Sequence, residues 1–260
     1  MILAKVIAVA NQKGGMGKTT TAVNLSSCFA LSEKKTLLVD CDPQGNATSG
    51  LGIDKGNLKI SIYDVLINEV PAEDAVLKTE VPYLEILPSN INLVGAEIEL
   101  VNIPDREKRL KSKLEPLKNL YDFILLDAPP SLGLLTINLL SAADSVLIPI
   151  QCEYYALEGL GQLLNTISLV KKNINSKIEI EGVLLTMFDS RLNLSKQVAE
   201  EVEKYFGDKI FKTMVKRNVR LSEAPSFGKP IILYDINSTG AQSYINLAKE
   251  ILDHGKASIG

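Results

Sequence analysis

The sequence has few of the side chains that build zinc, redox or triad centres. It contains only three cysteines, Cys28, Cys41 and Cys152, and one histidine, His254. The cysteines are widely spaced and lack the C-x-x-C pairing of zinc and dithiol sites. A lone histidine in the last residues gives no basis for a Ser-His-Asp arrangement. We therefore expect three reduced core thiols and chemistry that uses other side chains.

Long apolar runs and a strong charge of one sign are also missing. No span of eighteen apolar residues and no signal peptide is present, so we expect a cytoplasmic protein with no membrane partner. The net charge of −3 argues against coating nucleic acid through an overall positive field, so any such role needs a local patch. Without a linker-like stretch, residues 1–260 are expected to form one domain.

Short β-rich runs alternate with helical patterns along most of the chain. Several runs are apolar on successive residues, as in Phe123-Ile-Leu-Leu126, which is typical of strands covered on both faces. This order predicts an α/β fold with a doubly wound, mostly parallel sheet and helices on both faces. The expected strands are Val6–Ala10, Thr36–Asp40, Tyr83–Leu87, Phe123–Asp127, Ser145–Ile150, Glu181–Phe188, Ile210–Val215 and Pro230–Tyr234.

Polar residues before helical patterns predict where helices begin. Asn90 is expected to cap a helix to about residue 102, and Ser195 to cap residues 196–206, with Gly207 ending that helix. Ser238 is expected to cap the last helix, residues 239–252. Another helix should begin near Lys18 and direct its N-terminal dipole at bound anions.

A glycine-rich run between the first expected strand and helix predicts a phosphate site. Residues 11–20 read Asn-Gln-Lys-Gly-Gly-Met-Gly-Lys-Thr-Thr, which matches the phosphate-loop pattern except at its leading glycine. Lys18 can reach β- and γ-phosphates, Thr19 can bind Mg²⁺, and Lys13 adds a second cation. The alternative is a glycine-rich turn without a ligand. The expected nucleotide contacts here are Lys13, Gly14, Gly15, Met16, Gly17, Lys18, Thr19 and Thr20.

Two expected strands end in aspartates that suit a nucleotide with Mg²⁺. Asp40 ends one strand, with Asp42 two residues later, and Asp127 ends another. Carboxyl ends of parallel strands meet at one edge of a sheet. Asp127 is expected to hold Mg²⁺ through a water and Asp40 to support the metal shell. Asp42 is expected to orient the water that attacks the γ-phosphate. Turn or cap aspartates are the alternative.

Several long motifs resemble those of the ParA/Soj chromosome-partition ATPases, the deviant Walker family of phosphate-loop proteins. The glycine-rich run with its early lysine is one of them, although Met16 stands where valine is usual. The resemblance covers nearly the whole chain. The other matching segments are residues 38–52, 90–101, 127–138, 149–159 and 217–230.

The resemblance implies an ATP- and Mg²⁺-dependent switch. Two subunits would sandwich ATP, with Lys13 reaching the partner's phosphates, and Lys13, Lys18 and Asp42 would form the catalytic set. Contacts to the nucleotide are also implied for Thr186, Met187 and Arg217. The ATP-bound homodimer would bind double-stranded DNA without sequence preference. A ParB-type centromere-binding partner would stimulate slow hydrolysis and release the protein from the nucleoid, through order imposed by the γ-phosphate.

Basic residues gather late in the chain. Residues 209–229 hold six lysines and arginines against one acid, Glu223, a pattern that can neutralise DNA phosphates without reading bases. Charge alone fits a solvated face equally well, whereas the resemblance favours DNA. Lys216 stands where many relatives have proline. The expected DNA contacts are Arg191, Lys216, Arg217, Arg220 and Lys229.

Two other functions share this scaffold. A membrane-positioning ATPase of the MinD type needs a C-terminal amphipathic helix, and residues 252–260 lack its wide apolar face. A metal-cluster carrier or nitrogenase-type reductase needs cysteines that bridge a dimer, and Cys28, Cys41 and Cys152 form no pair. The partition ATPase is the interpretation that uses all of the motifs.

Overall fold

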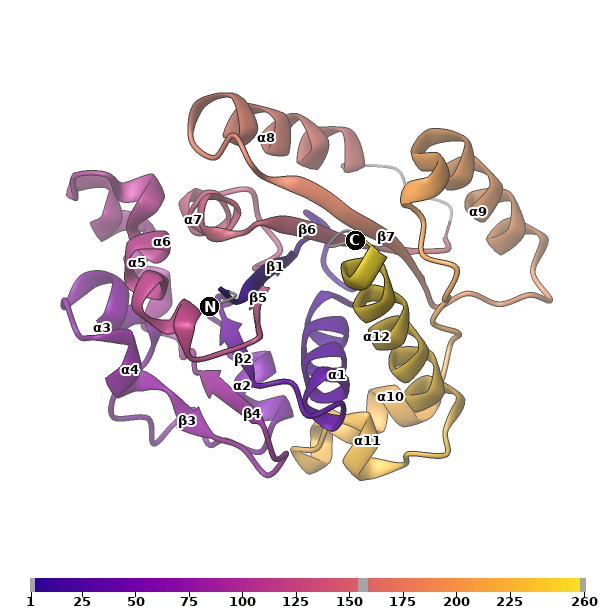
Figure 1. Cartoon of the computed structure of the whole chain (residues 1–260), viewed down its shortest axis with the longest axis horizontal. Helices are drawn as coiled ribbons and strands as arrows, with labels where there is room; N and C mark the ends of the chain where they lie inside the picture. Colours follow the sequence, from indigo (N-terminus) through magenta and orange to yellow (C-terminus); the bar gives the residue numbers. More distant parts are fainter. Residues whose placement is uncertain (1–2, 154–158, 258–260) are drawn as a thin grey trace.

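A computed structural model of the chain describes residues 3–153 and 159–257, with side chains described up to residue 253. Its centre is a seven-stranded sheet in the order β3-β4-β2-β5-β1-β6-β7 (Figure 1). All neighbouring strands are parallel except β3, which runs antiparallel to β4 at the edge. The strands are β1 Lys5–Val9, β2 Thr36–Asp40, β3 Leu77–Lys78, β4 Leu84–Leu87, β5 Phe123–Asp127, β6 Ser145–Gln151 and β7 Glu179–Thr186.

Helices cover both faces of the sheet, because alternate strand residues point to opposite sides and both sets are apolar. One core lies under α1, α2, α12 and the turns between α10 and α11 (Figure 1). The helices of this face are α1 Lys18–Leu31, α2 Asn46–Gly50, α10 Val219–Glu223, η5 Ala224–Phe227, α11 Ile231–Tyr234 and α12 Thr239–Ala257.

The second core lies under helices from the middle of the chain, α3 to α9. The predicted doubly wound α/β fold is therefore confirmed. The helices of this face are α3 Ile62–Ile67, α4 Ala72–Ala75, α5 Leu93–Glu99, η1 Leu100–Asn102, η2 Arg106–Lys108, α6 Arg109–Leu114, η3 Glu115–Asn119, α7 Leu134–Ala142, α8 Leu160–Asn173, α9 Asn193–Phe206 and η4 Gly207–Lys209.

Two expected strands are not strands. Residues 210–215 run beside β7 but form only a single bridge, because the Glu250 carboxylate accepts hydrogen bonds from the backbone N–H groups of Lys212 and Thr213. Residues 231–234 form the short helix α11, which follows Pro230, and its first N–H donates to Asn24 Oδ1 at 2.7 Å. A proline before a short apolar run thus begins a helix here, and the prediction was wrong.

The predicted ends of helices and strands are confirmed only in part. Ser238 caps α12, since its Oγ accepts from the N–H of Ala241, and Gly207 ends α9 with a φ of 55°. Ser195 does not cap α9, which begins at Asn193, and its hydroxyl donates instead to the Cys152 carbonyl. Asn90 lies two residues before the cap position of α5. Strand β7 ends before Met187, whose φ of 51° breaks the extended conformation.

Candidate functional site

The glycine-rich loop joins β1 to α1 at the carboxyl edge of the sheet. Gly15 and Gly17 adopt φ values of 77° and 85°, in the left-handed region that favours glycine. Asn11 fixes the loop from below, because its Nδ2 donates to the Pro149 carbonyl at 2.8 Å and its Oδ1 accepts from Lys13 N at 3.1 Å. The loop is therefore attached to the end of β6 through Asn11, a role the sequence did not predict.

Lys18 lies across the inside of this loop. Its side chain is buried, and its Nζ donates to the Lys13 carbonyl at 2.8 Å. Burial lowers the pKa of Lys18, while the nearby charges of Asp127 and Asp42 oppose that shift. A buried ammonium with one carbonyl partner at the N-terminus of a helix can bind an anion well.

Asp40 and Asp127 stand side by side at the carboxyl edge. They are register partners on β2 and β5, and both are fully buried. Asp40 accepts hydrogen bonds from Thr48 N and Thr48 Oγ1, each at 2.8 Å, and from Asp42 N at 3.1 Å. Burial raises the pKa of Asp40 to about 6, although the hydrogen bonds from Thr48 and Asp42 oppose the shift. Asp40 thus holds the loop that follows β2.

Asp127 differs from Asp40 because neither of its buried oxygens has a hydrogen-bond partner. Burial, followed by the charge of Asp40, raises the pKa of Asp127 well above that of an ordinary carboxyl, and the nearby Thr19 hydroxyl and Lys18 oppose this. Thr19 faces Asp127 without reaching hydrogen-bond geometry. An unsatisfied buried carboxylate beside a hydroxyl suits a hydrated divalent cation, so these residues fit Mg²⁺.

The number of protein ligands also fits such an ion. Among the described residues, no group of three or more histidine, cysteine or acidic side chains could enclose a metal. Mg²⁺ is commonly held by one or two protein oxygens together with phosphates and waters. Thr19 and Asp127 could supply such oxygens here.

Asp42 lies at the start of the loop after β2. Its side chain is 7% exposed, and its Oδ1 accepts from Gln44 N at 2.9 Å. The loop turns back at Gly45, where φ is 60° and an added Cβ would lie 2.8 Å from the Ser89 carbonyl oxygen. Only glycine fits this close approach. The Asp42 charge lies near enough to oppose the lowered pKa of Lys18 in the phosphate loop.

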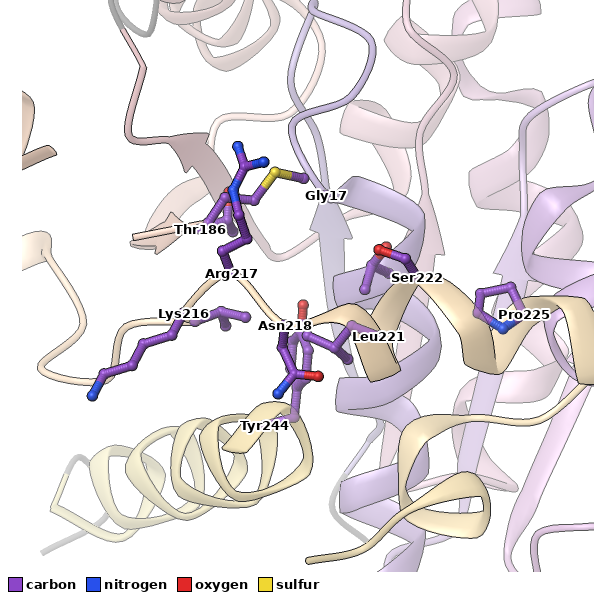
Figure 2. A pocket seen from close by; sticks show the side chains of 12 residues that line it. Gly17, Thr186, Lys216, Arg217, Asn218, Leu221, Ser222, Pro225 and Tyr244 are labelled. Carbon is purple, nitrogen blue, oxygen red and sulfur yellow. The ribbon is translucent and has the colours of Figure 1, made fainter. Parts of the chain in front are cut away.

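A pocket of about 240 Å³ adjoins the phosphate loop (Figure 2). It contains Gly17 and the expected nucleotide contacts Thr186, Met187 and Arg217, and Thr186 Oγ1 also donates to the Met16 carbonyl at 3.0 Å. Figure 2 shows the Lys216 side chain extending away from Gly17. Thr20, another expected nucleotide contact, also lines the pocket. The sequence did not predict several further lining residues, although most belong to the matching segment 217–230; they are Val215, Asn218, Leu221, Ser222, Pro225 and Tyr244.

The expected DNA contacts lie on the surface, and each of the three arginines has an acidic partner. Arg191 pairs with Asp189 at 2.7 Å, and Arg217 pairs with Glu153 at 3.0 Å. Arg220 lies 3.0 Å from Glu223 and 3.6 Å from Asp235. Most of these acids lie outside the basic run, so the folded surface is less positive than the run of sequence. We call these three residues the arginine surface.

Lys229 lies elsewhere. It is exposed and lines a second cavity, of about 220 Å³, together with Thr19, Thr20 and Ser49. This lysine is therefore near the phosphate loop as well as on the surface.

The three thiols are buried inside the chain. Burial raises the pKa of Cys28 and of Cys152 to about 12, so both stay protonated. None of the described helices is long and apolar enough to cross a membrane. The His254 side chain and residues 154–158, with Tyr154 and Tyr155, lie outside the described parts.

Comparison with known proteins decides the family. A model of the AAA domain family matches residues 4–180. The sporulation initiation inhibitor protein Soj of Bacillus subtilis is 60% identical over 253 residues, which span 97% of this chain and 100% of that protein. The chain belongs to the Soj/ParA family of partitioning ATPases. The chromosome partitioning protein ParA of Myxococcus xanthus, another member, is 57% identical over 96% of this chain and 88% of its own length.

Solved structures agree with this family fold. A cobyrinic acid a,c-diamide synthase from Mycobacterium smegmatis has been solved with ADP and magnesium and with an ATP analogue and magnesium. Both structures superpose with a TM-score of 0.87 at 36% identity, over 98% of this chain and 97% of that one. The Soj/ParA fold of this chain is thus close to one that binds nucleotide and metal in another protein.

Proposed function

We propose that this Soj/ParA ATPase is a slow, Mg²⁺-dependent switch for chromosome or plasmid partition, and that residues 1–260 act as one ATPase domain. The observation that carries the proposal is the pair of buried, unsatisfied oxygens of Asp127 beside Thr19 and the phosphate loop. A nucleotide–magnesium complex supplies the charge and ligands that this arrangement lacks. The nucleotide-bound relatives support the same ligands.

In this proposal the backbone N–H groups of residues 14–20 bind the phosphates, and the purine enters the pocket beside Thr186 and Met187. Lys18 exchanges the Lys13 carbonyl for β- and γ-phosphate oxygens. Arg217 flanks the base. The exchange is favourable because a phosphate is a stronger partner for a buried ammonium than a neutral carbonyl.

When bound with ATP, Mg²⁺ would supply positive charge that offsets the charge on the phosphate oxygens. Thr19 is proposed as a direct ligand and Asp127 as a ligand through water. Asp40 was expected in the metal shell, but its three hydrogen bonds to Thr48 and Asp42 support a positioning role instead. Asp42 is proposed to accept a hydrogen bond from the water that attacks the γ-phosphorus, which aligns that water opposite the breaking P–O bond.

Two copies of the chain are proposed to face each other across ATP, with Lys13 reaching the partner's phosphates. The dimer then places two arginine surfaces against one DNA duplex, and Lys216 and Lys229 add positive charge. Exposed arginines whose ion pairs are weak can exchange an acid for a DNA phosphate, which supports sequence-independent binding. Stimulation by a ParB-type partner would end the ATP-bound state and release the nucleoid.

The test is Asp42→Ala, compared with Asp208→Ala, which removes an exposed acid far from the site. We expect Asp42→Ala to slow ADP formation about 100-fold while ATP still binds, because water alignment is lost and phosphate contacts are kept. Light scattering with ATP should then show a dimer that persists. Hydrolysis at the wild-type rate in Asp42→Ala would contradict the assignment, and a protein that stays monomeric with ATP would contradict the dimer.

A further inference from the structure

Helix α5 and the turn η1 have an uncovered apolar face. The inner face of this element packs into the core through Leu93, Ala96 and Leu100. Four large apolar side chains on the outer face follow the spacing i, i+3, i+7 and i+10, which places them in one row. We call this row the α5 stripe, and its members are Ile91, 63% exposed, Val94, 52%, Ile98, 73%, and Val101, 52%.

Scattered exposed apolar residues are normal in a folded protein, but a continuous row with polar borders marks an interaction surface. Helices α3 and α7 both contact α5, yet all four side chains of the row stay more than half exposed, so neither helix covers the row. The row therefore has the shape of a ridge that a groove or a second amphipathic helix can cover.

The charges around the α5 stripe determine which kind of polypeptide segment can cover it. Residues 90–105 contain three acids, Glu97, Glu99 and Asp105, and no lysine or arginine. The next basic residue, Arg106, pairs with Glu107 at 3.0 Å and donates to the Val101 carbonyl at 2.6 Å, so one paired cation borders the stripe beside the three acids. A segment that combines apolar and basic side chains complements this surface. A second copy of the chain would bring the same acids to the stripe and is disfavoured by like charge.

The stripe is also joined to the catalytic edge of the sheet. Ser89, just before α5, donates its N–H to Thr48 Oγ1 at 2.9 Å, and the same hydroxyl donates to Asp40. The Ser89 carbonyl lies against Gly45 in the Asp42 loop. On the other side, the Glu97 side chain lies against Gly133, at the start of α7 and at the end of the Asp127 loop. A displacement of α5 is therefore passed to the Asp42 loop and to the Asp127 loop through direct contacts.

We propose that the α5 stripe is the docking site for a basic amphipathic helix of the partner protein that stimulates hydrolysis, an inference that rests on the proposed function. The apolar side of that helix covers Val94 and Ile98, and its lysines or arginines meet Glu97 and Asp105. Its binding shifts Ser89 and Gly133, and so adjusts Asp42 and Asp127 for water attack.

The experiment measures ATP hydrolysis at rising concentrations of purified ParB-type protein from the same cell, in the presence of DNA. The variants are Ile98→Ser and Glu97→Gln, and the control is Leu169→Ser, which removes an exposed apolar side chain from another helix, α8. We expect Ile98→Ser to raise the half-stimulating partner concentration about tenfold, as for a central apolar contact. Glu97→Gln should raise it a few-fold and weaken its salt dependence, since it removes a border charge. Basal hydrolysis should stay unchanged, because neither residue touches nucleotide.

The possible results distinguish the docking site from the proposed function. A wild-type protein that responds to the partner, together with an Ile98→Ser variant that needs about tenfold more partner for half stimulation, supports the docking site. Equal responses of wild type and Ile98→Ser overturn the docking site and leave the proposed function intact. A wild type that never responds overturns partner stimulation itself, and the docking site with it. If Ile98→Ser instead lowers dimer formation with an ATP analogue in light scattering, the stripe is a self-association surface, and the partner assignment is wrong.

Discussion

Charged side chains are held in two different ways at the phosphate edge of the sheet and on the arginine surface. At the phosphate edge, Lys18, Asp40 and Asp127 are buried and fixed by neighbouring strands and backbone groups. On the arginine surface, Arg191, Arg220 and their neighbour Arg217 keep 86%, 54% and 65% of their side chains exposed while each pairs with an acid. The phosphate edge thus holds charges that are largely shielded from solvent, whereas the arginine surface holds charges that are exposed to it.

The difference predicts how each region responds to a ligand. A buried charge that loses its partner is costly, so the phosphate edge should bind few ligands, tightly and with fixed geometry. An exposed ion pair contributes little and is screened by salt, so the arginine surface can exchange its acids for a polyanion. The first region suits nucleotide chemistry and the second suits reversible DNA contact.

The largest effect is expected from Lys18→Ala, which breaks the phosphate edge. Removing the buried ammonium leaves Asp127 and Asp42 without the cation that offsets them and takes away the main partner of the β- and γ-phosphates. We expect ATP affinity to fall at least about 100-fold, measured by calorimetry, and dimer formation to be lost. Lys172→Ala, which removes an exposed lysine on α8, should bind ATP normally. Normal ATP affinity in Lys18→Ala would contradict the phosphate assignment.

A smaller effect is expected from Gly45→Ala, which disturbs the loop that holds Asp42. Alanine is strained at a φ of 60°, and its Cβ would meet the Ser89 carbonyl at 2.8 Å. We expect a loss of about 1–3 kcal/mol in the free energy of unfolding, seen as a Tm lower by several degrees. Gly161→Ala is the control, because a Cβ there meets nothing within 4 Å and α8 favours alanine. Equal Tm values for both variants would show that the loop adapts freely.

The same contrast explains what the sequence could predict. The phosphate loop could be predicted because its residues are contiguous in the sequence. The carboxylates could be predicted because they lie at the ends of apolar runs typical of buried strands. Neither the bond from Thr48 to Asp40 nor the missing partners of Asp127 has a sequence signal, since each depends on how loops meet. The acids that pair with Arg191 and Arg217 could not be foreseen either. Residues 231–234 were wrongly predicted to be part of a strand, because four apolar residues fit a helical turn as well as a strand.

Arg220→Ala tests whether the arginine surface exchanges its acids for DNA. Binding to a random-sequence duplex, measured by fluorescence anisotropy with an ATP analogue, should weaken several-fold at low salt. The slope of log affinity against log salt should become shallower by about 1, as for one lost phosphate contact. Arg106→Ala removes another arginine paired with an acid, a half-buried one beside η1, and should leave both values unchanged. An unchanged slope for Arg220→Ala would mean that Arg220 stays with Glu223 and Asp235 in the complex.

The smallest effect is expected from Glu69→Gln, which measures how much an exposed carboxylate contributes when it pairs with two largely buried cations, Arg109 and Lys113. Hydrogen bonds from Lys113 and Arg109 lower the pKa of Glu69 from its usual 4.5 to about 2. A lowered carboxyl pKa contributes stability that is complete above pH 4.5 and disappears as the pH falls toward 2. We expect Tm at pH 7 to fall by about 1–2 °C, with a smaller difference from wild type at pH 3 and no change in the control Glu200→Gln. A decrease of more than about 5 °C at pH 7 would contradict a small contribution from this ion pair.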